Sequence, residues 1–168
     1  NTNISQLRGI TMVRFGIIGT NRITENFLGA ASLLPDFQLT AVYSRTEEKA
    51  QAFASKFGAL HTFTDLTEMA KSDVIDAVYI ASPNSFHAEQ SILFLENKKH
   101  VLCEKPLASN VTEVSAMIEA AKQNQVLLME AMMPLFLPNF QILQHNLHKI
   151  GAVQRYFANF CKYSSRYD

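Results

Sequence analysis

The sequence predicts an α/β fold with a doubly wound parallel sheet, and three observations carry that prediction. From Met12 onward, short apolar runs alternate with longer stretches whose apolar residues recur at helical spacing. The short runs are apolar at consecutive positions, as strands covered on both faces are. Breakers such as Pro35 and Gly58 separate the two kinds of segment. Strands and helices that alternate in this way form a parallel sheet through right-handed crossovers.

Each element follows from its own pattern. The apolar runs predict strands over Val13–Ile18, Gln38–Tyr43, His61–Phe63, Asp76–Ala81, His100–Cys103 and Val126–Glu130. Helical spacing predicts helices over Arg22–Leu34, Glu47–Phe57, Leu66–Lys71, Phe86–Asn97 and Val111–Asn124. The first of these helices stops at Pro35 and the second at Gly58, residues that commonly end helices.

The two ends of the chain differ from this repeat. Residues 1–11 show no amphipathic period, and we expect them to be an N-terminal extension ahead of a sheet domain over residues 12–133. Beyond it, the pattern predicts a helix over Phe140–Ile150 and a strand over Ala152–Tyr163. A single strand is not a stable sheet. We therefore expect residues 134–168 to be the truncated start of an α+β domain.

Composition excludes several classes of partner. Fifteen Lys and Arg balance fifteen Asp and Glu, so nucleic acid and anionic membranes are not expected as electrostatic partners. No apolar run reaches the roughly 18 residues of a membrane helix. Cys103 and Cys161 each stand alone, which fits a reducing compartment and predicts a cytoplasmic protein. His145 and His148 have metal-ligand spacing without a third ligand, so no metal site is expected.

The turn after the first strand is a candidate anion site. A G-x-G-x-x-G turn starting at Gly19 would bring backbone N–H groups against a pyrophosphate at the helix start. Asn21 and Thr24 replace its second and third glycines. Asn tolerates positive φ, so the tight turn can be kept. Taken alone, the turn leaves open an ordinary connection between a strand and a helix.

The end of the second strand bears on the choice between NAD and NADP. An NAD-binding fold usually has a carboxylate there for the ribose hydroxyls, whereas this chain has Ser44 and Arg45. A hydroxyl and a guanidinium suit a 2′-phosphate, which favours NADP and leaves NAD as the alternative. The other interpretation is a solvated Arg45 paired with Glu47 or Glu48.

Polar residues also follow the later strands. Asn84 and His87 come after the fourth strand, and Glu104 and Lys105 come after the fifth. Ligands of doubly wound sheets bind outside the carboxyl ends of strands, where Lys105 could donate to a substrate oxygen and steer a proton. Most lysines are solvated surface residues, and a lone histidine such as His87 more often caps or packs.

Four stretches together carry a resemblance to a known family. They are FGIIGTNRI at 15–23, SPNSFHAE at 82–89, CEKPLA at 103–108 and MEAMMPLFLP at 129–138. The chain from residue 12 to residue 168 resembles the Gfo/Idh/MocA family of NAD(P)-dependent oxidoreductases. This resemblance implies a Rossmann domain that binds NAD(P), then an α+β domain that supplies substrate contacts and a homo-oligomer interface through its sheet.

The resemblance also assigns roles by position. Lys105 matches the catalytic lysine of the E-K-P motif. The cofactor-binding positions it implies are Gly19, Thr20, Asn21, Arg22, Ile23, Ser44, Arg45, Ser82, Pro83, Asn84, His87, Glu104 and Lys105. Two departures stand out: Asn21 replaces a glycine, and Leu135-Phe136 replaces an Arg-Phe pair. The family's second catalytic position, usually a histidine, is expected beyond Asp168, so this fragment alone is expected to be inactive.

The expected function is hydride transfer between NADP(H), or NAD(H), and a sugar-like or small polyol or carbonyl substrate. In that hypothesis Lys105 polarises the reacting oxygen. The alternative is a non-catalytic NADP-binding module that senses redox state. An intact E-K-P motif favours the enzyme, because a module that only binds the cofactor does not need Lys105.

Overall fold

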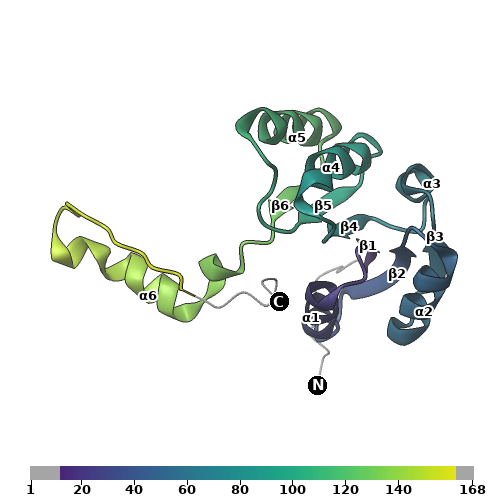
Figure 1. The fold of residues 1–168 in the computed structure, drawn as a ribbon, viewed down its shortest axis with the longest axis horizontal. Helices are drawn as coiled ribbons and strands as arrows, with labels where there is room; N and C mark the ends of the chain where they lie inside the picture. Colours follow the sequence, from purple (N-terminus) through teal and green to yellow (C-terminus); the bar gives the residue numbers. More distant parts are fainter. Residues whose placement is uncertain (1–11, 162–168) are drawn as a thin grey trace, which may run out of the picture. The chain divides into compact units, whose positions relative to one another are not determined.

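A parallel sheet forms the centre of the larger structural unit (Figure 1). In the computed structural model, which describes residues 12–161, six strands pair in the order β3-β2-β1-β4-β5-β6. They are β1 (Val13–Ile18), β2 (Phe37–Tyr43), β3 (His61–Phe63), β4 (Ala77–Ile80), β5 (His100–Cys103) and β6 (Leu128–Glu130). Every pairing is parallel, so the predicted doubly wound parallel sheet is confirmed.

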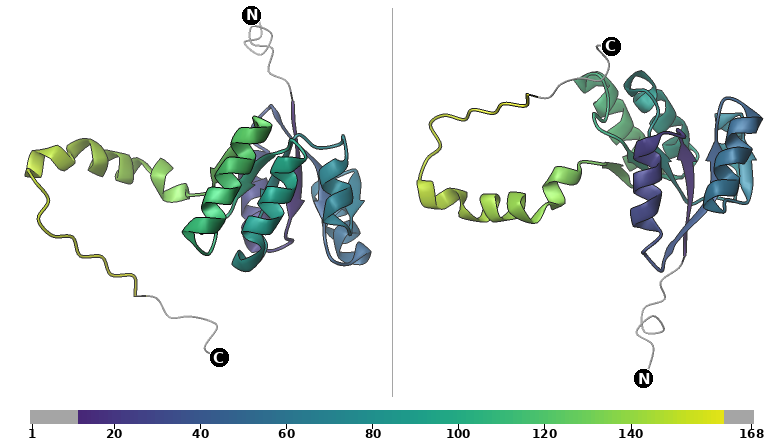
Figure 2. Two further views of the ribbon diagram at one scale, coloured as in Figure 1. Left: turned by 90° about the horizontal axis from the view of Figure 1, so that it is seen from above. Right: turned by 60° about the horizontal axis from the view of Figure 1, so that its bottom comes forward.

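Helices cover both faces of this sheet (Figure 2). They are α1 (Arg22–Ala31), α2 (Glu47–Phe57), α3 (Leu66–Lys71), α4 (His87–Glu96) and α5 (Val111–Asn124). Leu28 of α1 and Phe53 of α2 pack in one core cluster, whereas Met69 of α3, Phe94 of α4 and Ala121 of α5 pack in the other. The sheet therefore separates two apolar layers, which is why its strands are apolar on consecutive residues.

Strand β4 shows this two-sided burial most clearly. All four of its residues are buried. Val78 and Ile80 join the core beside α4 and α5, and Tyr79 joins the core beside α1 and α2. Each fully buried side chain of this size contributes about 1.5–3 kcal/mol relative to exposure.

Two helices of the sheet domain have ends that differ from those predicted from the sequence. The first helix ends at Ala31 and continues as tight turns, in which Leu34 N–H donates to Ala31 O. Pro35 causes this, since the residue before a proline is disfavoured in helical conformation. The segment predicted as a helix from Phe86 opens instead with a 3₁₀ turn over Asn84–Phe86, and α4 begins at His87.

The chain forms a second structural unit from Met132 onward. It contains a 3₁₀ turn over Met133–Phe136, helix α6 (Pro138–Asn146) and a 3₁₀ turn over Leu147–Ile150. Proline suits the first turn of a helix, so α6 begins earlier than predicted.

The predicted strand over Ala152–Tyr163 is wrong for the residues described, because 152–161 contain no strand. A strand needs a neighbour for its backbone groups, and none pairs with it in the described chain. Tyr163 and the expected extension over residues 1–11 lie outside the described residues. Nowhere in residues 12–161 is a helix long and apolar enough to cross a membrane.

Candidate functional site

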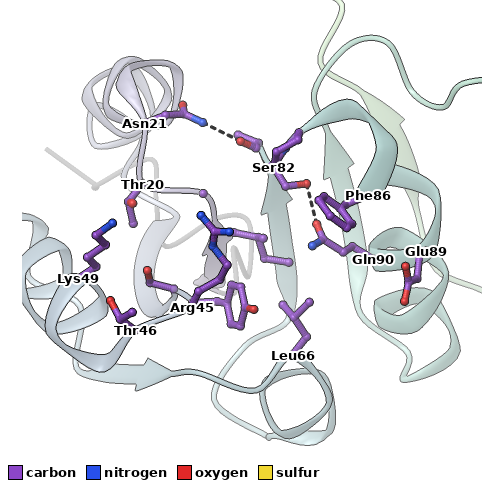
Figure 3. Close-up of a pocket in the computed structure, with 16 residues that line it drawn as sticks. Thr20, Asn21, Arg45, Thr46, Lys49, Leu66, Ser82, Phe86, Glu89 and Gln90 are labelled. Carbon is purple, nitrogen blue, oxygen red and sulfur yellow. Dashed lines mark hydrogen bonds between the residues drawn. The ribbon is translucent and has the colours of Figure 1, made fainter.

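A pocket of about 730 Å³ opens at the carboxyl ends of β1, β2 and β4 (Figure 3). The sheet order reverses here, since β2 lies on one side of β1 and β4 on the other. Crevices at such a point bind ligands in doubly wound sheets. Most of the lining comes from three segments: Gly19, Thr20 and Asn21 after β1, Ser44, Arg45, Thr46 and Lys49 from the end of β2 into the start of α2, and Ser82, Pro83, Phe86, Glu89 and Gln90 from the end of β4 into the start of α4.

Gly19 allows the turn after β1 to lie close to the end of β4, at the edge of this pocket. Its φ is +102°, a conformation that favours glycine. A Cβ atom at Gly19 would also lie 2.5 Å from the carbonyl oxygen of Ala81. Both the backbone conformation and the space therefore require glycine here.

Asn21 caps the helix instead of turning the chain. Its φ is −106°, so the turn is kept without the positive φ that asparagine tolerates, and the positive φ of this turn lies at Gly19. The Asn21 Oδ1 accepts from the N–H groups of Ile23 at 3.0 Å and Thr24 at 3.2 Å. Its Nδ2 donates to Ala81 O at 2.7 Å, which joins the turn to the end of β4. An asparagine thus performs two structural tasks at a position where the motif has glycine.

The start of α1 leaves backbone donors available for a ligand. Within residues 12–161, the N–H groups of Thr20, Asn21 and Arg22 have no protein acceptor. Such groups at the start of a helix bind phosphates. The side chains of Arg22 and Ile23 are exposed and do not line the pocket, and Ile23 N–H is already bonded to Asn21.

Thr24 replaces the third glycine of the motif and is fully buried. Its Oγ1 donates to Gly19 O at 2.7 Å. This bond fixes the first turn of α1 against the glycine turn. The turn is therefore built from one glycine and two side chains that bond to the backbone.

The β2 end of the pocket collects cations and hydroxyl groups. The Arg45 and Lys49 side chains point into the pocket from this side, with Thr46 beside them (Figure 3). Across residues 12–161, neither Arg45 nor Lys49 has a carboxylate within 4.0 Å. Glu47 Oε1 instead accepts from Gln51 Nε2 at 2.8 Å and from Thr62 Oγ1 at 2.7 Å. The alternative in which Glu47 or Glu48 neutralises Arg45 therefore does not occur.

Helix α2 begins at this same end. Thr46 is its N-terminal cap residue, yet its side chain makes no capping hydrogen bond. Ser44 is buried, and its N–H donates to Phe63 O at 3.1 Å. Two cations without a carboxylate partner in residues 12–161, the Thr46 hydroxyl and the start of a helix thus surround one end of the pocket, an arrangement that suits a phosphate group.

The loop after β4 bounds the opposite wall. Ser82 Oγ donates to Gln90 Oε1 at 2.7 Å, and Pro83 lines the pocket beside them. Asn84 is exposed and does not line the pocket. His87 is fully buried, so its ring does not face the pocket either. Its Nδ1 lies 2.8 Å from Pro106 O and its Nε2 lies 3.0 Å from Ser82 O.

Glu104 and Lys105 follow β5, the neighbour of β4, outside the residues that line the pocket. Lys105 is exposed, and its Nζ makes no hydrogen bond or ion pair with any described residue. Glu104 is half-buried, and its Oε1 accepts from Tyr79 Oη at 2.6 Å. Burial, together with the Glu104 carboxylate, raises the pKa of Tyr79, so the phenol keeps its proton and donates.

The pocket includes residues that the sequence analysis did not assign to it. They are Ile18, Tyr43, Leu66 and Ala81, together with Thr46, Lys49, Phe86, Glu89 and Gln90. The last three recur at i, i+3 and i+4 from the end of β4, a spacing that places side chains on one helix face. That spacing was available in the sequence as a signal.

Comparisons with known proteins agree with this geometry. A family model described as "Oxidoreductase family, NAD-binding Rossmann fold" matches residues 13–132. The chain belongs to the Gfo/Idh/MocA family. The family suggested by the four motif stretches is therefore confirmed.

Relatives of this Gfo/Idh/MocA chain include characterised and uncharacterised oxidoreductases. The scyllo-inositol 2-dehydrogenase (NADP(+)) IolU of Bacillus subtilis (strain 168) is 62% identical over 157 residues, which are 94% of this chain and 48% of that protein. The uncharacterized oxidoreductase YgjR of Escherichia coli (strain K12) is 55% identical over 156 residues, which are 93% of this chain and 48% of that protein. The chain spans about half the length of the curated relatives it matches.

A solved structure shares the fold. The 3-ketoreductase KijD10 from Actinomadura kijaniata, determined with NADP and TDP-benzene, matches with a TM-score of 0.76 and 31% identity. The match covers 82% of this chain and 42% of that one. The Rossmann architecture of the Gfo/Idh/MocA family is thus present in this chain.

Proposed function

We propose that this chain binds NADP(H) in the pocket at the carboxyl ends of β1, β2 and β4, and that it is the cofactor-binding part of an oxidoreductase. One observation carries the proposal: the β2 end of the pocket holds Arg45 and Lys49 without a carboxylate partner among the described residues. A carboxylate at that strand end would favour the ribose hydroxyls of NAD, whereas two cations whose charges are not neutralised by described residues favour the additional phosphate of NADP. The names of the B. subtilis relative and of the KijD10 structure, both of which include NADP, support the same cofactor.

The residues that line the pocket fit the pyrophosphate and the adenosine end of this cofactor. The free N–H groups of Thr20, Asn21 and Arg22 would hold the pyrophosphate at the start of α1. Gly19 lets the turn after β1 lie against Ala81, which places this turn at the edge of the pocket. Ser44, Arg45, Thr46 and Lys49 would hold the 2′-phosphate, and Ser82 and Pro83 would bound the ribose.

Lys105 is the catalytic residue of the proposal. When bound, NADP supplies a nicotinamide ring that accepts or donates a hydride. The free ammonium group of Lys105 would donate a hydrogen bond to the reacting hydroxyl or carbonyl oxygen and hold a proton beside it. Glu104 would neighbour the cofactor, with its carboxylate fixed by Tyr79.

We further propose a sugar-like or small polyol substrate. The names of relatives support this class, since the B. subtilis protein is a scyllo-inositol dehydrogenase and a protein of Xenopus laevis, 37% identical, is a trans-1,2-dihydrobenzene-1,2-diol dehydrogenase. Both names denote oxidation of ring diols or polyols. A homo-oligomer and a cytoplasmic location belong to the same proposal.

A hybrid protein tests the reaction. In it, this chain replaces the 157 matching residues of the B. subtilis relative, and reduction of NADP⁺ is followed at 340 nm with a panel of inositols and sugars. The hybrid is expected to turn over a polyol. Lys105→Ala is expected to lower kcat by about 10²- to 10⁴-fold while NADPH affinity stays within about twofold.

The second candidate function is a non-catalytic module that binds NADP and senses redox state. The Lys105 side chain, which has no partner among the described residues, weighs against it, because cofactor binding in the pocket does not require that residue. A hybrid that binds NADPH but oxidises no member of the panel would support this module over the enzyme. Equal losses of turnover and of NADPH affinity in Lys105→Ala would make Lys105 a binding residue instead.

A further inference from the structure

The imidazole ring of His87 joins two loops that are separate in the sequence. The ring is fully buried at the start of α4. Its Nδ1 lies 2.8 Å from the carbonyl oxygen of Pro106, and its Nε2 lies 3.0 Å from the carbonyl oxygen of Ser82. Ser82 lines the cofactor pocket, and Pro106 directly follows Lys105.

The chemistry of these partners fixes what the ring must do. Carbonyl oxygens only accept hydrogen bonds, whereas a neutral imidazole has one donor nitrogen and one acceptor nitrogen. Because carbonyl oxygens only accept, at least one ring nitrogen must carry hydrogen and donate. The other ring nitrogen lies against the second carbonyl oxygen, so the buried ring contacts both loops whichever nitrogen donates.

We propose that His87 is a positioning residue whose buried ring bridges the carbonyl oxygens of Pro106 and Ser82 and so holds the Lys105–Pro106 turn against the Ser82 loop. The loop that bounds the cofactor and the turn that carries the lysine then keep one relative position. The importance of this contact for catalysis rests on the proposed function, because Lys105 acts there on the reacting oxygen. The contact itself does not depend on the cofactor.

Other bonds hold the same turn from different elements. Glu104 accepts from Tyr79 Oη at 2.6 Å, and Leu107 N–H donates to Glu130 Oε1 at 2.8 Å. These bonds attach the turn to β4 and β6. Loss of the His87 bonds is therefore expected to loosen the turn locally while the domain stays folded.

Two substitutions separate the two bonds. The side-chain nitrogen of His87→Asn reaches about as far as Nδ1, so this variant can keep the bond to Pro106 and lose the bond to Ser82. The side-chain nitrogen of His87→Gln reaches about as far as Nε2, so it can keep Ser82 and lose Pro106. The two variants are therefore matched controls for each other.

Hydrogen–deuterium exchange of the free chain is the test. In His87→Gln, amides of residues 104–109 are expected to exchange about tenfold faster, and those of residues 82–86 to stay within about twofold. In His87→Asn the pattern is expected to reverse. Equal acceleration of both loops in both variants, in step with the loss of thermal stability, would overturn the proposal and leave the ring as packing alone.

The unsubstituted protein gives a second measurement that needs no variant to fold. A ring N–H of His87 is expected to appear in the ¹H–¹⁵N NMR spectrum and to exchange slowly with water, because the ring is buried and bonded to a carbonyl oxygen. A ring N–H that exchanges as fast as that of an exposed histidine would overturn the bridging arrangement. Neither measurement contains cofactor or substrate, so each is independent of whether the proposed function holds.

In the hybrid protein the two bonds should affect different constants. His87→Gln is expected to lower kcat by about tenfold with little change in the KM for NADP⁺, because it frees the Lys105 turn. His87→Asn is expected to raise that KM more than it lowers kcat. Identical effects of both variants on kcat and KM would contradict separate roles for the two bonds.

Discussion

Replacing Arg45 with alanine should weaken NADPH binding far more than NADH binding. Arg45 points into the β2 end of the pocket, and no carboxylate lies within 4.0 Å of it in residues 12–161. Removing the Arg45 side chain therefore deprives no described carboxylate of an ion-pair partner. NADH lacks the 2′-phosphate, so its affinity is expected to stay within about twofold.

The magnitude follows from the contacts that would be lost. A hydrogen bond to a charged group contributes about 1.5–3 kcal/mol, which corresponds to roughly 10- to 150-fold in affinity. Arg45 is exposed, so solvent screening places the expected loss near the lower end, at about tenfold. Lys49 and Thr46 remain in Arg45→Ala, and we expect about 100-fold when Lys49→Ala is added.

The assay is titration of the 168-residue chain with NADPH and NADH, followed by nucleotide fluorescence at two salt concentrations. Lys56→Ala is the matched control, since it removes one positive charge at an ion pair with Glu25 that does not line the pocket. The control is expected to leave both affinities within about twofold. Equal NADPH and NADH affinity in the unsubstituted chain, or an Arg45→Ala effect no larger than that of Lys56→Ala, would refute the 2′-phosphate argument.

Three further substitutions test the turn and the sheet. Gly19→Ala should abolish measurable NADPH binding and lower the free energy of unfolding by about 1–3 kcal/mol, because its Cβ would meet Ala81 O; unchanged urea unfolding would contradict this. Asn21→Ala should cost about 1 kcal/mol of stability through the lost helix cap, measured by the same unfolding; a cost within error would show that the cap is dispensable. The hydrogen-bonded Arg14 guanidinium lowers the pKa of Asp76 from its usual 3.8. The resulting stabilisation is complete above that value and disappears as the pH falls through the native pKa. Thermal unfolding between pH 7 and pH 2 should therefore show a smaller acid-induced loss in Asp76→Asn, and an equal loss would count against the ion pair.

Much of the sheet domain followed from the sequence because local patterns determined it. The strands over Val13–Ile18, His61–Phe63 and His100–Cys103, and the helices over Glu47–Phe57 and Val111–Asn124, were predicted with the bounds observed. These segments combine a clear apolar period with a breaker or cap at the end. The strand over Ala152–Tyr163 failed in its described part because alternation alone does not supply a pairing partner.

The site was less predictable, since it depends on contacts between distant residues. The sequence placed Asn21 at a glycine position but not its bond to Ala81, 60 residues away. The contact of His87 with Pro106 exists because β4 and β5 are neighbours in the sheet, which brings their following loops together. The lack of an ion pair between Arg45 and Glu47 likewise depends on a distant contact, because the Glu47 carboxylate accepts a hydrogen bond from Thr62 Oγ1. The sequence identified the loops, and the fold determined which side chains remain available to a ligand.

A crystal structure of this chain with NADPH bound would show which residues hold each part of the cofactor. We expect the 2′-phosphate on Arg45 and Lys49, the pyrophosphate on the N–H groups at the start of α1, and the nicotinamide ring on the side of the β5 end that carries Lys105. A nucleotide bound outside the pocket, or one bound with its 2′-phosphate away from Arg45 and its nicotinamide away from Lys105, would contradict this expectation.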